Sequence, residues 1–238
     1  MKLDILAFGA HPDDVEISAG ATLLKYAKEG KSIGIIDLTK GELGTRGSVE
    51  QRYKEAQAAS EILQLKIRKN LQLGDGVFDV SQENKLKVIE LIRLYRPQLV
   101  LANSLKDRHP DHGRAAQLVA DACYLSGLDK IKTSHEGVNQ EKFRPDLLLH
   151  YIQDYNLNPD VILDVSETGT QKLEVIKCYK SQFYDPDSSE PETPISGEEF
   201  FSYLEGRMMS YGRELGVTYG EAFNISRTLG VKDLFALK

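Results

Sequence analysis

Short, almost continuous apolar segments recur along the chain and predict buried β-strands. The first covers residues 3–10 and contains a single charged residue, Asp4. Segments of this length and composition are typical of parallel strands that are covered on both faces of a sheet. Predicted strands occupy residues 3–10, 32–39, 70–73, 98–102, 146–152 and 161–165.

Segments with apolar residues at helical spacing separate most of these strands and predict α-helices. Gly30 is the predicted C-terminal cap of the first helix, and Ser81 is the predicted N-terminal cap of the third. The alternation of strands and helices predicts an α/β fold, with a doubly wound, mainly parallel sheet of Rossmann-like topology. We expect residues 1–238 to form one domain, because no linker or internal repeat divides them. Predicted helices cover residues 15–28, 50–65, 82–95, 113–124, 167–180 and 198–215.

Two polar segments predict loops. Residues 40–49 contain Gly41, Gly44 and Gly47, whose spacing matches neither a dinucleotide-binding fingerprint nor a P-loop, so we interpret them as a flexible active-site loop. Residues 184–197 are rich in Pro, Ser, Asp and Glu and predict an exposed loop without an assigned role.

The composition is that of an ordinary globular protein and narrows the classes of partner. Hydrophobic residues make up 41% and charged residues 28%, and the net charge of −6 gives no reason to expect a nucleic acid or an anionic membrane. No apolar run approaches the roughly 18 residues of a membrane span, and no secretory signal pattern is present. We therefore expect a cytoplasmic protein with two buried free thiols in helices, Cys123 and Cys178.

Two segments that contain His, Pro and Asp follow predicted strands. AHPDDVE (residues 10–16) follows the first strand, and KDRHPDHG (residues 106–113) follows the strand that ends at residue 102. One such segment is usually a turn or a helix cap. Two of them, each at a strand end, predict a common site at the carboxyl edge of the sheet, where α/β proteins bind ligands.

His11, Asp14 and His112 form a ligand set suited to catalytic Zn²⁺. Two imidazoles and one carboxylate leave a fourth coordination position open for water or substrate. A structural zinc site would normally use four protein ligands, usually including cysteines, and none is nearby in the sequence. The sequence therefore predicts a zinc cofactor, although iron(II), cobalt and manganese accept such ligands as well.

The remaining polar residues of the two segments suit amide hydrolysis. Asp13 is the predicted general base for the attacking water. His109 is predicted to act as an imidazolium that stabilises an oxyanion or protonates a departing amine. Asp111 or Asp107 would orient the ring of His109 and raise its pKa.

These segments resemble the paired signatures of the LmbE-like, or PIG-L-type, zinc-dependent N-acetylglucosamine deacetylases. The loop TKGELGTRG (residues 39–47), with Arg52 and Glu55 downstream, resembles the third signature of that family, and the resemblance extends to about Gln182. The chain length and the KSQF stretch (residues 180–183) look most similar to the deacetylases of bacillithiol biosynthesis. Those enzymes act on N-acetylglucosaminyl malate, a small sugar conjugate.

The resemblance implies the same ligand set and the same base, Asp13. It assigns stabilisation of the tetrahedral intermediate to His109 and the orientation of that ring to Asp111. It also implies that Arg52 contacts the substrate, whereas the sequence pattern alone would leave this arginine as a solvated charge on a helix. A homo-oligomer is implied as well.

Other functions stay open at this point. The chain could be a deacetylase of a mycothiol-type precursor, a chitooligosaccharide or an antibiotic intermediate, or a non-catalytic Rossmann-like protein. The absence of GxGxxG after the first strand disfavours a dinucleotide-binding protein. His150, at the end of an apolar strand, is interpreted as a core or edge histidine, and a contact of Tyr184 with the substrate from the loop after KSQF stays open. Candidates for a contact with malate are Arg46, Arg108 and Arg114.

Overall fold

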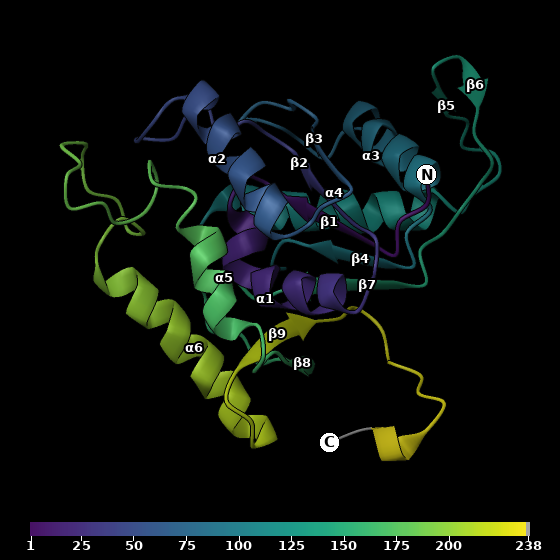
Figure 1. Cartoon of the computed structure of the whole chain (residues 1–238). Helices are drawn as coiled ribbons and strands as arrows, with labels where there is room; N and C mark the ends of the chain where they lie inside the picture. The colour runs from purple at the N-terminus through teal and green to yellow at the C-terminus, as the bar shows by residue number, and fades with distance from the viewer. Residues whose placement is uncertain (237–238) are drawn as a thin grey trace.

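A seven-stranded sheet forms the centre of the computed structural model, which describes residues 1–236 (Figure 1). The strand order is β3-β2-β1-β4-β7-β9-β8. The first five strands in this order run parallel, whereas β9 is antiparallel to both of its neighbours. The predicted mainly parallel α/β sheet is therefore confirmed. The strands are β1 (Ile5–Gly9), β2 (Ile33–Asp37), β3 (Ile67–Asn70), β4 (Leu99–Ala102), β7 (Leu147–Tyr151), β8 (Val161–Asp164) and β9 (Gly220–Asn224), and β5 (Ser134–His135) with β6 (Val138–Asn139) forms a separate hairpin.

Helices cover both faces of the sheet, which makes it doubly wound. One hydrophobic core joins the sheet to α1, α2, α5 and α6, and a second joins it to α3 and α4. Figure 1 shows α1 and α5, which belong to the first core, side by side. The helices are α1 (Asp14–Lys28), α2 (Val49–Ile62), α3 (Gln82–Tyr95), α4 (Pro110–Leu125), α5 (Gly169–Ile176) and α6 (Glu199–Leu215), and a short 3₁₀ turn, η1, covers Leu234–Ala236.

The local signals account for several element boundaries. All five residues of β1 are buried, as expected for a central strand. The hydroxyl of Ser81 accepts a hydrogen bond from the backbone N–H of Asn84, so the predicted cap of α3 is confirmed. Gly30 follows α1 with a φ of 80°, a conformation that glycine adopts without steric cost.

Several elements differ from the prediction, among them β3, α4 and β9. β3 spans Ile67–Asn70 rather than 70–73, because the buried Arg68 pairs with carboxylates where the pattern required an apolar residue. α4 begins at Pro110, three residues before the predicted start, since Pro is well suited to the first turn of a helix. β9 was not predicted, because its second residue, Glu221, is charged although it is buried.

The two thiols lie in different environments. Cys123 is buried in α4, as expected. Cys178 is only partly buried and follows the end of α5 at Ile176, so the expectation of a second buried helical thiol was wrong. Among residues 1–236, no helix has the length and hydropathy required to span a bilayer.

Candidate functional site

The two His-Pro-Asp segments meet at the carboxyl edge of the sheet. They follow β1 and β4, which are neighbouring parallel strands (Figure 1). The backbone N–H of Ala10 donates a hydrogen bond to Oδ1 of Asn103 at 3.0 Å, which ties the two strand ends together. The ring centroids of His11 and His112 lie 5.6 Å apart. The order of the strands thus brings both segments into one site.

Asp13 precedes α1 in a strained backbone conformation. Its φ of 119° is rare for a residue with a side chain, and such a conformation typically costs about 1–3 kcal/mol. The carboxylate makes no capping hydrogen bond and is 6% exposed. Burial raises the pKa of Asp13 to about 7; the charge of Arg52 opposes this rise and that of Asp14 adds to it. Asp13 is therefore suited to accept a proton near neutral pH.

Asp14 is held by four contacts in the first turn of α1. Its Oδ2 accepts hydrogen bonds from the His11 backbone N–H and from Asn103 Nδ2, both at 2.9 Å. Its Oδ1 accepts one from Gln153 Nε2 at 3.1 Å and lies 3.1 Å from His112 Nε2. Burial raises the pKa of Asp14, but the charges of His112 and His11 hold it well below the ordinary value. Asp14 is therefore ionised and fixed in orientation.

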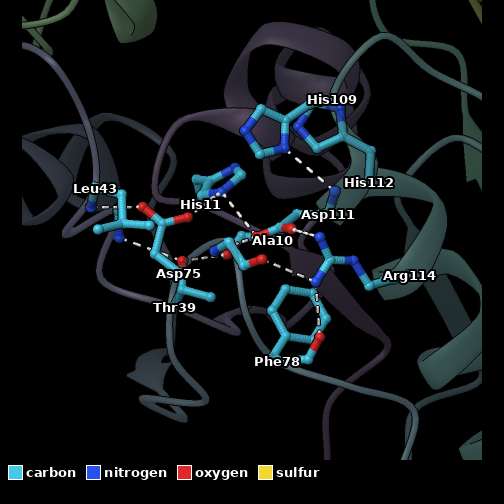
Figure 2. Close-up of polar contacts among 12 residues, drawn as sticks. Ala10, His11, Thr39, Leu43, Asp75, Phe78, His109, Asp111, His112 and Arg114 are labelled. Atoms are coloured by element: carbon cyan, nitrogen blue, oxygen red, sulfur yellow. Dashed lines mark hydrogen bonds and ion pairs between the residues drawn. The ribbon is translucent and has the colours of Figure 1, made fainter.

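His11 contacts carboxylates through both ring nitrogens. Its Nε2 lies 2.9 Å from Asp75 Oδ1, and its Nδ1 lies 3.6 Å from Asp14 Oδ2. Figure 2 shows the ring of His11 turned toward Asp75, whose second oxygen accepts a hydrogen bond from the Leu43 backbone N–H at 2.8 Å. The contact with Asp75 leaves Nδ1 of His11 on the side of Asp14.

His112 lies between two carboxylates. Its Nε2 faces Asp14 and its Nδ1 lies 3.4 Å from Asp107 Oδ2. Burial lowers the pKa of the His112 ring, but the two carboxylates outweigh this effect and bring it to about 9. A similar balance applies to His11, where burial lowers the pKa and Asp111, Asp14 and Asp75 raise it well above the ordinary value.

His109 lies beside the other two histidines, with its ring centroid 4.8 Å from that of His11 and 5.2 Å from that of His112 (Figure 2). Its Nδ1 accepts a hydrogen bond from the Asp111 backbone N–H at 3.2 Å. Burial and the charges of the two neighbouring histidines lower its pKa. Because Nδ1 accepts this hydrogen bond, Nε2 is the ring nitrogen left to carry a proton toward the cavity.

The carboxylate of Asp111 has other partners than the one predicted from the sequence. It lies 2.7 Å from Arg114 Nη2 and accepts a hydrogen bond from the Gly76 backbone N–H at 2.8 Å. Among residues 1–236, no hydrogen bond joins this carboxylate to the ring of His109. Asp111 contacts His109 through its backbone, and its charge favours the protonated form of that ring.

A cavity of about 310 Å³ opens over these residues. The loop at Leu43–Thr45, the loop at Thr193–Ile195 and α6 form its outer wall. The two loops are joined where Arg46 donates a hydrogen bond to the Ser188 hydroxyl at 2.9 Å. The sequence left residues 184–197 without a role, and part of this loop lines the cavity.

Arg52 is buried in the wall of this cavity, with 6% of its surface exposed. The expectation from pattern alone, a solvated charge on a helix, was therefore wrong. A side chain at Gly41 or Gly44 would collide with the Arg52 guanidinium, so the glycine loop leaves room for this arginine. Its charge is the strongest influence that lowers the pKa of Asp13, which indicates that the two groups are close.

The residues present fit a divalent cation. Among residues 1–236, two groups of three side chains have ligand atoms that all lie within 4.8 Å of one another, namely His11 with His109 and His112, and His11 with Asp75 and Asp111. Asp14 contacts two of these histidines directly. The surrounding carboxylates favour positive charge at this point, as the raised pKa values of His11 and His112 show, and a bound metal would replace those protons.

Sequence reasoning missed three buried residues around the ligand set: Asp75, Asn103 and Gln153. Asp75 follows β3 in a Gly-Asp-Gly turn, and its position after a strand was the one available signal. His150 is 1% exposed and its Nδ1 lies 2.8 Å from the backbone oxygen of Asn103, so its interpretation as a core histidine is confirmed. Tyr184 is 41% exposed and does not line the cavity.

Comparison with known proteins identifies the family. The PIG-L family model, described as GlcNAc-PI de-N-acetylase, matches residues 6–123. The conserved protein TT1542 from Thermus thermophilus is 35% identical in sequence, with a TM-score of 0.84 over 97% of this chain and 98% of that one. The chain belongs to the PIG-L family.

Two curated relatives show the range of reactions among similar proteins. A diacetylchitobiose deacetylase from Thermococcus kodakarensis is 29% identical over 227 residues, which cover 91% of this chain and 80% of the relative. A 4-oxalmesaconate hydratase from Pseudomonas putida is 25% identical over 193 residues, which cover 74% and 73%. Sequence similarity alone therefore does not determine the reaction of this chain.

Proposed function

We propose that this PIG-L protein is a zinc-dependent hydrolase that removes the acetyl group from an N-acetylglucosamine conjugate, with N-acetylglucosaminyl malate as the first candidate substrate. One observation carries the proposal: Asp13, Asp14 and three histidines lie together in one cavity. Among residues 1–236, the buried carboxylate of Asp13 has no hydrogen-bond partner. This is the set of groups that amide hydrolysis requires: a base, a donor to the developing oxyanion, and ligands for a Lewis acid.

His11, Asp14 and His112 would hold the zinc ion. When bound there, zinc supplies Lewis-acid polarisation of the attacking water and of the amide carbonyl. Asn103 and Gln153 donate hydrogen bonds to the Asp14 carboxylate, which fixes its orientation. Partners of this kind are needed because ligand geometry depends on the groups that support each ligand.

Asp13 moves the proton. Its carboxylate removes a proton from water as the water oxygen adds to the acetyl carbonyl carbon. The same carboxylic acid then returns the proton to the amine nitrogen as the C–N bond breaks, and acetate and the free amine leave. A pKa of about 7 suits both steps, since the group accepts and releases a proton near neutral pH.

His109 stabilises the charge that develops on the carbonyl oxygen. Its Nδ1 is occupied by the Asp111 backbone N–H, so its Nε2 carries the proton and is free to donate toward the substrate. A donor fixed in this way before the reaction costs no reorganisation when the negative charge appears. Arg52, which lies near Asp13 in the cavity wall, is the proposed contact to the sugar.

The choice of substrate rests on the relatives and on the size of the cavity. The Thermococcus relative is named for an N-acetylated disaccharide, and a cavity of about 310 Å³ is in the range of small-ligand sites. A mycothiol-type precursor, a chitooligosaccharide and an antibiotic intermediate are the alternatives from the same class. We also propose a cytoplasmic homo-oligomer, which light scattering and fractionation would test.

Acetate release from a panel of conjugates tests the proposal. The panel contains N-acetylglucosaminyl malate, N-acetylglucosaminyl inositol, diacetylchitobiose and free N-acetylglucosamine, each with zinc-loaded enzyme. We expect the highest kcat/KM on the malate conjugate. Faster release from another member would replace the substrate, and hydration of an unsaturated carboxylic acid without any acetate release would overturn the hydrolase proposal.

A further inference from the structure

The three arginines that the sequence offers as contacts for malate are already neutralised by acidic groups of the chain itself. Arg108 Nε lies 2.8 Å from Asp154 Oδ2. Arg46 Nε lies 3.6 Å from Glu190 Oε2 and also donates a hydrogen bond to the Ser181 carbonyl. The third candidate from the sequence, Arg114, pairs with Asp111 as described above. None of the three is therefore free to bind an anion without the loss of an existing ion pair.

Arg207 of α6 differs from these arginines. It lines the cavity, and no ion pair with it is found among the described residues 1–236. Its Nη1 donates to the Tyr203 hydroxyl at 3.3 Å, and its guanidinium carbon lies 5.6 Å from the centroid of the Tyr203 ring. Its Nη2 is buried and has no hydrogen-bond partner. A charge without an opposite charge beside it is costly to bury, so the guanidinium of Arg207 is suited to bind an anion that enters the cavity.

Glu221, which lines a smaller pocket together with Arg207, is already bound by other groups. Glu221 Oε1 lies 2.7 Å from the ammonium of Lys172, and the two Glu221 oxygens also accept hydrogen bonds from the backbone N–H groups of Ala21 and Thr22. Burial lowers the pKa of Lys172, and the charge of Arg207 lowers it further. Arg207 therefore adds a positive charge beside Lys172 and Glu221, which already neutralise each other.

The position of Arg207 separates it from the reacting groups. The Tyr203 hydroxyl accepts from Arg207 and donates to the Asp154 backbone oxygen at 3.1 Å, so the α6 wall is fixed to the loop after β7. Phe200 lines the same wall. Arg52, in contrast, is close enough to Asp13 to lower its pKa. Among residues 1–236, no ion pair is found for two arginines of the cavity wall, Arg52 near the base and Arg207 on α6.

We propose that Arg207 binds an anionic group on the aglycone of the substrate and so determines specificity for acidic conjugates, a proposal that rests on the deacetylase function above. A carboxylate matches the planar fork of a guanidinium and would supply the opposite charge that Arg207 lacks among residues 1–236. The ring of Tyr203 and its hydroxyl hold the guanidinium in place for this contact.

Kinetics with two substrates tests the assignment. The substrates are N-acetylglucosaminyl malate, which carries carboxylates, and the neutral methyl N-acetylglucosaminide. For Arg207→Gln we expect kcat/KM on the malate conjugate to fall about 10- to 100-fold, the usual effect of a lost charged hydrogen bond, mainly through KM. The neutral glycoside should be hydrolysed as by the wild type. Arg213→Gln, on the exposed face of the same helix, is the matched control and should leave both substrates unchanged.

The outcomes distinguish the inference from the function on which it rests. An equal loss on both substrates, or no loss on either, would overturn the assignment of Arg207 while leaving deacetylation intact. Calorimetric binding of N-acetylglucosaminyl malate to metal-free protein provides a readout that needs no turnover. Binding that Arg207→Gln weakens and Arg213→Gln does not would support the anion site even where acetate release fails. Equal binding to both variants and to the wild type would refute it.

Discussion

Replacing Asp13 with Asn should separate the effect of this carboxylate on stability from its effect on catalysis. The side chain keeps its shape but can no longer take a proton from water. We therefore expect Asp13→Asn to bind zinc as the wild type does and to lose about 10²–10⁴-fold in kcat, the usual contribution of a general base. Added zinc should not restore activity, because the ligand set is intact.

The same substitution should stabilise the metal-free protein at neutral pH. Burial raises the pKa of Asp13 from the ordinary value of 3.8 to about 7, so between these values the folded state holds a proton that the unfolded state has lost. The free energy of unfolding then falls as the pH rises through this range. This difference corresponds to a gain in the free energy of unfolding of about 2–4 kcal/mol for the variant at pH 8.

Urea unfolding of EDTA-treated wild type and Asp13→Asn at pH 4, 6 and 8 measures this effect. The two proteins should have similar stability at pH 4, and the variant should become progressively more stable as the pH rises. The exposed Asp146, directly before β7, offers the control Asp146→Asn. A constant difference between variant and wild type from pH 4 to pH 8 would refute the argument that burial of Asp13 carries the cost.

Further substitutions test the rest of the site. His112→Ala should bind far less than one zinc per chain by elemental analysis, and undiminished metal content would remove His112 from the ligand set. Asp75→Asn should weaken zinc binding about 10- to 100-fold in a chelator competition, because it disturbs the ring of His11, whereas Asp146→Asn should not. In the native protein a thiol reagent should modify Cys178 before Cys123, whose pKa burial raises to about 12; peptide mapping that finds Cys123 first would contradict this.

The reacting residues could be predicted from the sequence because they lie in two short segments directly after strands. A residue in such a segment has few possible positions, since the strand end fixes where the next turn begins. Asn103 and Gln153 could not be found in the same way. They are common polar residues that act only through hydrogen bonds to Asp14, a residue 89 and 139 positions away. Spacing along the chain carries no signal for such contacts.

Buried charges explain the other failures of prediction. Arg52, Arg68 and Glu221 each stand where a pattern of apolar and polar residues indicates either a surface or no element. Arg68 and Glu221 are tolerated inside because an opposite charge accompanies each of them, and those partners come from distant parts of the chain. The pattern of residues along the chain predicts a buried element only where the buried side chains are apolar.

The strained turn at Asp13 depends on one of these buried networks. Glu16, one turn further along α1, lies 2.6 Å from Arg68 Nη1, and the same guanidinium makes two hydrogen bonds of 2.8 Å to Asp37 at the end of β2. These contacts fix the start of α1 to β2 and β3. Asp14 fixes it from the other side through β4 and the segment after β7. Because both anchors hold the turn, the backbone keeps a φ of 119° at Asp13, and the carboxylate between them has no hydrogen-bond partner in the part of the chain that the structure describes.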